Sequence, residues 1–201
     1  MKSNGMDKVR KAAEILKRGG IVIFPTDTVF GVGCILSDEK AVERLYKIKK
    51  RPKEMPTLLL VKDLSQAEQF VEFNKISKKL AKSFWPGALT IVLKAKSLVS
   101  KLILGKNNTL GLRIPNHEVP RKLIDLVGEP ILAPSANFRG FKAPSKLSEI
   151  DKGLLNLVDY VIELECGGEK PSTIVEVLDN THRIIRTGPI TNEQIFKTLQ
   201  E

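Results

Sequence analysis

Short apolar runs alternate with amphipathic stretches along the whole chain, a pattern typical of an α/β protein. The apolar runs predict strands at Ile21–Phe24, Thr57–Val61, Leu89–Leu93, Thr109–Ile114, Ile131–Ala133, Tyr160–Glu163, Thr173–Leu178 and Arg183–Arg186. Helical spacing of apolar residues predicts helices at Asp7–Arg18, Ser65–Phe70, Ile76–Phe84, Glu118–Leu126 and Leu147–Leu155. Two further helices are marked by capping residues: Ser37 before one, and Thr191 with Gln194 as a capping box before the last. We therefore expect one α/β domain over residues 5–201, with a twisted, open, mixed sheet flanked by helices.

Composition narrows the class of protein. The chain has 201 residues and a formal net charge of +10, an excess that favours anionic partners such as nucleotides or RNA. Two cysteines, Cys34 and Cys166, are too few for a disulfide framework. The N-terminal residues lead into a charged amphipathic stretch, and no apolar run approaches the ~20 residues of a membrane span. These features predict a cytoplasmic protein.

Polar clusters lie between the predicted helices and strands and contain the candidate site residues. Pro25–Thr28 and Pro134–Asn137 directly follow apolar strands, and Lys49–Pro52 adds a cluster of cations. The carboxyl ends of strands in an open α/β sheet border a ligand crevice, so hydroxyl, amide and cationic groups should meet there. The sequence thus predicts a basic crevice for a small anionic substrate.

Several other chemistries lack their sequence signature. The two histidines, His117 and His182, have no Cys or carboxylate neighbours at metal-ligand spacing, so we expect no protein-bound metal and interpret them as surface or capping residues. Neither a Walker phosphate loop nor a G-x-G-x-x-G fingerprint is present. A nucleotide would therefore have to be held by side chains.

Seven motifs in register resemble the YrdC-like threonylcarbamoyl-AMP synthases. They are Pro25–Gly33, Ile48–Pro52, Phe84–Thr90, Gly111–Pro115, Ala133–Asn137, Pro171–Val175 and Arg186–Gly188. The resemblance implies a YrdC-like fold and a nucleotidyltransferase that joins L-threonine, bicarbonate or CO2, and ATP with Mg2+ into threonylcarbamoyl-AMP, releasing pyrophosphate. It also implies a partner enzyme that transfers the threonylcarbamoyl group to the adenosine beside the anticodon of tRNA.

The resemblance also assigns roles to matching positions. Lys49 and Arg51 would form the catalytic, phosphate-contacting pair of a K-x-R motif. The implied ATP-binding residues are Lys49, Arg51, Thr109, Ser135, Asn137, Ala143 and Arg186. The implied threonine-binding residues are Thr28, Arg113, Ala133 and Ser172. Taken from the residues alone, Arg113 could instead form a salt bridge at a strand edge, and Thr26 and Asp27 could serve only to hold their loop.

The chain departs from the family pattern at several positions, and two alternatives to a synthase stay open. Phe30 stands where tyrosine is frequent, Phe138–Ser145 differs from the usual loop, and the chain length resembles the short branch of the family. One alternative is a divergent paralogue of the same fold, such as the carbamoyl-adenylate domain of hydrogenase maturation. The other is an RNA-binding module without synthase activity, suggested by the net charge alone.

Overall fold

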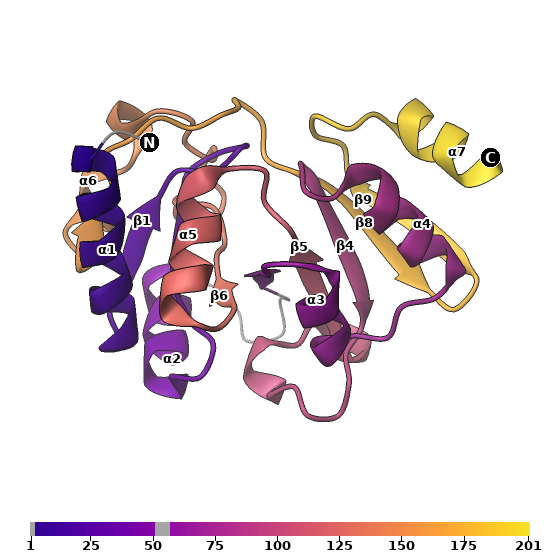
Figure 1. The fold of residues 1–201 in the computed structure, drawn as a ribbon, viewed down its shortest axis with the longest axis horizontal. Coiled ribbons are helices and arrows are strands. Elements are labelled where there is room, and N and C mark those ends of the chain that lie inside the picture. Colours follow the sequence, from indigo (N-terminus) through magenta and orange to yellow (C-terminus); the bar gives the residue numbers. More distant parts are fainter. Residues whose placement is uncertain (1–2, 51–56) are drawn as a thin grey trace.

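The computed structural model describes residues 3–50 and 57–201 and shows an open, mixed α/β fold (Figure 1). The strands are β1 (Val22–Phe24), β2 (Gly31–Ile35), β3 (Leu58–Leu60), β4 (Leu89–Lys94), β5 (Thr109–Arg113), β6 (Ile131–Leu132), β7 (Tyr160–Val161), β8 (Thr173–Leu178) and β9 (Thr181–Arg186). The α-helices are α1 (Ser3–Lys17), α2 (Glu39–Ile48), α3 (Leu64–Phe70), α4 (Lys75–Phe84), α5 (Glu118–Val127), α6 (Lys152–Leu155) and α7 (Asn192–Gln200). Short 3-10 helices lie at η1 (Lys101–Ile103), η2 (Lys106–Asn108) and η3 (Leu147–Glu149).

The strands form one sheet in the order β7-β1-β2-β6-β3-β5-β4-β8-β9. The pairs β1–β7, β3–β5 and β4–β8 are parallel, and the other neighbours are antiparallel. Helices α1, α2 and α5 lie at the end of the molecule that holds β1, whereas α4 and α7 lie beside β4, β8 and β9 (Figure 1). The expected mixed, open sheet with flanking helices is confirmed.

Two apolar clusters hold the helices on the sheet. In one, Leu16 of α1 and Leu123 of α5 are fully buried with Phe24 of β1. In the other, Leu80 of α4 and Ile195 of α7 are fully buried together with residues of β4, β5 and β8. Burying one such side chain contributes about 1.5–3 kcal/mol, so these stripes fix where each helix lies.

The sequence pattern did not predict strand β2. Its residues Gly31 and Gly33 weaken the apolar signal, yet Gly33 is needed because a Cβ there would collide with the carbonyl oxygen of Leu132 on β6. The predicted Ser37 cap was also wrong. Asp38 caps α2 by accepting a hydrogen bond from the Ala41 N–H at 2.9 Å, whereas the Ser37 hydroxyl donates to Glu129.

The capping box of the last helix is confirmed. Thr191 Oγ1 accepts from the Gln194 N–H at 3.2 Å, and Gln194 Oε1 accepts from the Thr191 N–H at 2.8 Å. The helix predicted over Leu147–Leu155 is instead divided into η3 and α6. No helix in the described part of the chain is long and apolar enough to cross a bilayer.

Candidate active site

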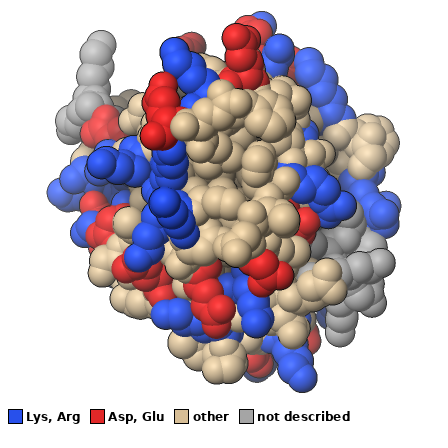
Figure 2. Space-filling model, turned by 90° about the vertical axis from the view of Figure 1, so that its right-hand side faces the viewer, with Lys and Arg blue, Asp and Glu red and all other residues tan. Residues whose placement is uncertain are grey.

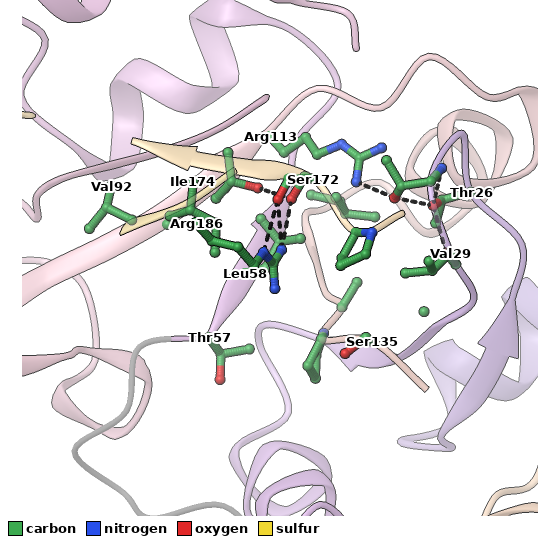
Figure 3. A pocket seen from close by; sticks show the side chains of 18 of the residues that line it. Thr26, Val29, Thr57, Leu58, Val92, Arg113, Ser135, Ser172, Ile174 and Arg186 are labelled. Carbon is green, nitrogen blue, oxygen red and sulfur yellow. Dashed lines mark hydrogen bonds between the residues drawn. The ribbon is translucent and has the colours of Figure 1, made fainter. Parts of the chain in front are cut away.

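A cavity of about 400 Å³ opens over one face of the sheet (Figure 3). This volume lies within the range of roughly 300–1,000 Å³ typical of ligand pockets. Its wall is built from the β1–β2 loop, from β3, β4 and β5, from the segment after β6, and from β8 and β9. The polar side chains on the wall are Thr26, Thr28, Thr57, Thr90, Thr109, Arg113, Ser135, Ser172, Glu176 and Arg186.

Arg113, the last residue of β5, lies in this wall although it is only 2% exposed. Its Nε donates to the carbonyl oxygen of Gly87 at 2.9 Å, and its Nη1 donates to Thr28 Oγ1 at 2.8 Å. Its Nη2 donates to Asp27 Oδ1 in a buried ion pair. Burial lowers the pKa of Arg113, and the charge of Asp27 opposes that shift. An arginine remains protonated under such conditions, so the wall carries a fixed cation held on three sides.

The hydroxyls of Thr26 and Thr28 form a chain in which each hydrogen can be assigned. Thr26 Oγ1 donates its one hydrogen to the carbonyl oxygen of Val29 at 2.8 Å and accepts from the Thr28 N–H at 3.0 Å. The 2.9 Å hydrogen bond between the two hydroxyls must therefore run from Thr28 to Thr26. Because Thr28 Oγ1 also accepts from Arg113, one lone pair remains. Thr28 can thus accept a hydrogen bond from an amine or hydroxyl in the cavity.

A second arginine lines the cavity from β9. Arg186 donates from Nε and Nη2 to the carbonyl oxygen of Ser172 at 3.1 and 2.8 Å, and Figure 3 shows these two residues together beneath Arg113. The Ser172 hydroxyl lies 2.8 Å from that of Thr90 on β4. Burial lowers the pKa of Arg186, and the positive charge of Arg113 lowers it further. Two nearby cations make this part of the cavity favourable for carboxylate and phosphate groups.

Lys49, which follows α2, is 4% exposed and supports the cavity from behind. Its ammonium donates to the carbonyl oxygens of Ser135 and Asn137 and, at 3.3 Å, to Asn137 Oδ1. The Ser135 hydroxyl donates to Asn137 Oδ1 at 2.6 Å. Lys49 therefore fixes the loop that places Ser135 on the wall. Arg51 lies outside the described residues, so its phosphate contact stays a prediction.

The structure gathers most of the described candidate residues in one place. Those on the cavity wall are Thr28, Thr109, Arg113, Ala133, Ser135, Ser172 and Arg186. Lys49 and Asn137 lie behind Ser135, and Ala143 is not among the described residues that line the cavity. The structure places these residues without testing their roles, which remain predictions.

The wall also contains residues that the sequence did not mark for the site, Thr90 and Gly111 among them. Thr90 interrupts the apolar strand β4 with a hydroxyl that meets Ser172. Gly111, in the middle of β5, leaves room because it has no side chain facing Thr90 and Val92. The signal for both was present: a polar residue in an apolar strand and a glycine inside a strand each indicate a nearby ligand or close approach.

The described part of the chain gathers no carboxylate cluster that could hold a metal at this cavity. Among residues 3–50 and 57–201, no group of three or more His, Cys, Asp or Glu side chains is placed to hold a metal ion. His117 caps α5 by accepting from the Val119 N–H at 3.2 Å, which confirms its interpretation as a capping residue.

An open mixed sheet that carries a basic, hydroxyl-lined cavity defines an α/β protein suited to small anionic ligands. Comparison with known proteins narrows this class. The profile of the Sua5_yciO_yrdC family, described as "Telomere recombination", matches residues 14–188. The chain therefore belongs to the Sua5/YciO/YrdC family.

Several relatives in this family are named as enzymes. The threonylcarbamoyl-AMP synthase of Pyrococcus abyssi is 35% identical over 199 residues, covering 96% of this chain and 58% of that protein. The threonylcarbamoyl-AMP synthase of Photobacterium profundum is 31% identical over 187 residues, covering 91% of this chain and 100% of that protein. The crystal structure of P. abyssi Sua5 complexed with L-threonine matches with a TM-score of 0.89 and 33% identity, covering 95% of this chain and 57% of that one. The chain thus spans little more than half the length of the Pyrococcus protein.

Proposed function

We propose that this protein is an L-threonylcarbamoyladenylate synthase. The observation that carries the proposal is Arg113, a buried arginine on the wall of a cavity that also holds Arg186 and several hydroxyls. A planar guanidinium suits an amino-acid carboxylate, and a second cation suits a phosphate. The family membership and the fold shared with a threonine-bound relative support the same substrate.

The reaction needs positioning rather than a protein nucleophile. The threonine amine adds to CO2, losing a proton, and forms a carbamate. A carbamate oxygen then bonds to the α-phosphorus of ATP while the bond to pyrophosphate breaks. Arg113 would hold the threonine carboxylate, and the free lone pair of Thr28 would accept from the amine or hydroxyl of threonine. Arg186 would neutralise phosphate charge as the nucleotide approaches.

ATP would enter as its Mg2+ complex, with the metal as part of the substrate. Arg51 would contact the phosphates, and Lys49 would act through the Ser135–Asn137 loop that it holds. Thr109 and Ser135 lie on the wall where the nucleotide would extend. We further infer one domain over residues 5–201, a cytoplasmic location, and delivery of the adenylate to a threonylcarbamoyl transferase that modifies tRNA beside the anticodon.

The test is mass spectrometry of the purified protein with ATP, Mg2+, bicarbonate and L-threonine, and with each component omitted in turn. A threonylcarbamoyl-AMP peak that requires all components is expected. Arg51→Ala should weaken ATP use and Arg113→Ala threonine use, each by roughly 10- to 150-fold in catalytic efficiency, because each removes a charge-assisted hydrogen bond. Folded, ATP-binding protein that forms no such product would contradict the proposal and favour a paralogue acting on another amino acid or carbamoyl donor.

The RNA-binding alternative makes a different prediction. Salt-sensitive RNA binding that ATP and threonine leave unchanged would support it. On the face shown in Figure 2, Lys and Arg side chains are interspersed with Asp and Glu around an uncharged centre. Such mixed charge gives less counterion release than a uniformly basic surface, so this face gives little support to the RNA-binding alternative.

A further inference from the structure

We propose that Asp27 is a positioning residue that orients Arg113 for the substrate carboxylate; this inference rests on the proposed function. Asp27 is not among the described residues that line the cavity, so it acts from behind the guanidinium. The side chains of Arg113 and Asp27 are 3% and 13% exposed, and Asp27 Oδ1 accepts from Nη2. The pair is therefore largely excluded from water.

The hydrogen bonds of Arg113 leave a defined pair of donors. A guanidinium has five N–H groups. Within the described part of the chain, one each on Nε, Nη1 and Nη2 is directed to Gly87, Thr28 and Asp27. One N–H on each terminal nitrogen remains, which is the number that a carboxylate takes in a two-point contact. Asp27 decides which N–H of Nη2 is left for the substrate.

The backbone of Asp27 is itself held in place. The Gly167 N–H donates to the carbonyl oxygen of Thr26 at 2.8 Å. A Cβ on Gly167 would lie 3.2 Å from Asp27 Cα, and one on Gly168 would lie 2.7 Å from the Asp27 carbonyl oxygen. Only a segment without side chains can approach this closely. The Gly167–Gly168 segment thus packs closely against the β1–β2 loop and helps to fix the position from which Asp27 contacts Arg113.

The negative charge of Asp27 also supports its role as a positioning residue for Arg113. A buried guanidinium without a counter-ion is costly, and burial lowers the pKa of Arg113 while Asp27 opposes that shift. Asp27 therefore keeps a charged, oriented donor ready before threonine arrives.

The test compares Asp27→Ala with Asp27→Asn by calorimetric binding of L-threonine and of ATP to each variant. The amide of Asn keeps an acceptor oxygen for Nη2 but removes the charge, so D27N should bind threonine within about threefold of wild type. D27A loses the acceptor and should bind threonine roughly 10-fold or more weakly, with ATP affinity unchanged. Both variants should unfold at lower temperature, because both leave the buried cation without its counter-ion.

A purely structural role would give a different pattern. It would weaken threonine and ATP binding together, in proportion to the lost thermal stability, and D27N would not recover threonine binding. Either that pattern or full threonine affinity in D27A would overturn the inference. Wild-type protein that binds no threonine would overturn the proposed function and the inference with it, so the two failures are distinguishable.

A second measurement tests whether the Arg113 guanidinium is held in place. The Arg113 Nε–H signal in 15N NMR, assigned by its loss in Arg113→Lys, should be slowly exchanging in wild type and in D27N. In D27A it should exchange faster, because the guanidinium is free to move. An unchanged signal in D27A would overturn the inference even if threonine binding fell.

Discussion

Thr28 Oγ1 accepts a hydrogen bond from Arg113 Nη1 at 2.8 Å, which joins the β1–β2 loop to the end of β5. The two residues are 85 positions apart in the chain. They bring together the two groups that the proposed function assigns to threonine: a cation for its carboxylate and an oxygen acceptor for its amine or hydroxyl. Since the Thr28 hydrogen is directed to Thr26, this acceptor role is fixed before a substrate binds.

Replacing Thr28 with valine should therefore impair threonine use selectively. Valine keeps the shape but removes the acceptor for Arg113 and for the substrate, so KM for threonine should rise roughly 10- to 100-fold. KM for ATP should change little. Thr28→Ser is the control, because its hydroxyl can restore both contacts. Equal loss for threonine and ATP, or no recovery in the serine variant, would contradict the assignment.

Filling the cavity from the middle of β5 should block binding without unfolding the protein. A Cβ on Gly111 would lie 3.3 Å from Thr90 Cγ2 and 3.6 Å from Val92 Cγ2, so the side chain of Gly111→Val would enter the cavity. Valine also suits a strand better than glycine does. We expect loss of substrate binding by calorimetry in a variant that still unfolds in a single cooperative transition. Retained substrate affinity in a folded variant would place the substrates elsewhere.

Much of the fold follows from local patterns in the sequence. The apolar runs that became β3, β4 and β8 contain no glycine, and in β5 the single glycine, Gly111, lies between Leu110 and Leu112, so all four strands were predicted. Strand β2 was missed because its glycines serve close packing against β6, a contact made by residues nearly a hundred positions away. The Ser37 cap was wrong because two adjacent polar residues both suited that role, and only the partner Glu129 decided between them.

The candidate site was predictable in its residue types but not in its contacts. The resemblance to the family identified Arg113 and Lys49, yet the sequence could not show that Arg113 would be paired with Asp27. Nor could it show that the Lys49 ammonium would bond to backbone carbonyl groups of a loop 86 positions away. Such pairings depend on how the β1–β2, α2 and β6 segments meet in the fold. Local propensity carries no information about them.

Lys49 should matter for both stability and nucleotide use. Lys49→Met keeps the buried stem but leaves carbonyl oxygens of Ser135 and Asn137 without this donor, which should cost about 1–3 kcal/mol in the free energy of unfolding. The displaced loop should also raise KM for ATP. Lys47→Met, on the exposed side of α2, is the matched control and should leave both quantities unchanged. Urea unfolding and ATP titration measure the two effects, and equal behaviour of the two variants would contradict the role of Lys49.

A methyl group at Gly168 should disturb the β1–β2 loop. Its Cβ would lie 2.7 Å from the Asp27 carbonyl oxygen and 3.2 Å from Thr28 Cα, so the loop must move. We expect Gly168→Ala to lose about 1–3 kcal/mol of stability and to raise KM for threonine. Gly167→Ala has its nearest contact at 3.2 Å and should show a smaller effect. Equal effects of the two substitutions in denaturation and kinetics would argue against this steric account.

The cap at the start of α5 should make stability depend on pH. His117 Nδ1 accepts from the Val119 N–H, so the ring must be neutral there, and its Nε2–H faces the Glu165 carbonyl oxygen at 3.3 Å. Burial lowers the pKa of His117 below 6.5, and Arg113 lowers it further, while the Glu165 hydrogen bond and the charges of Asp27 and Glu118 oppose this shift. The unfolded chain therefore binds the proton first as pH falls. The contribution of His117 to stability is complete above pH 6.5 and is lost as pH falls below that value toward the folded pKa.

His117→Asn separates this cap from other titrating groups. Asparagine is a good N-cap and has no proton to gain in this range, so the variant should keep wild-type stability at pH 7.5 and lose less of it at pH 5. His117→Ala should lose about 1 kcal/mol at pH 7.5, because no side chain then accepts from Val119. Urea unfolding at the two pH values measures these differences. Because the capping hydrogen bond requires an unprotonated Nδ1, equal pH dependence in wild type and His117→Asn would mean that the titration lies in another group.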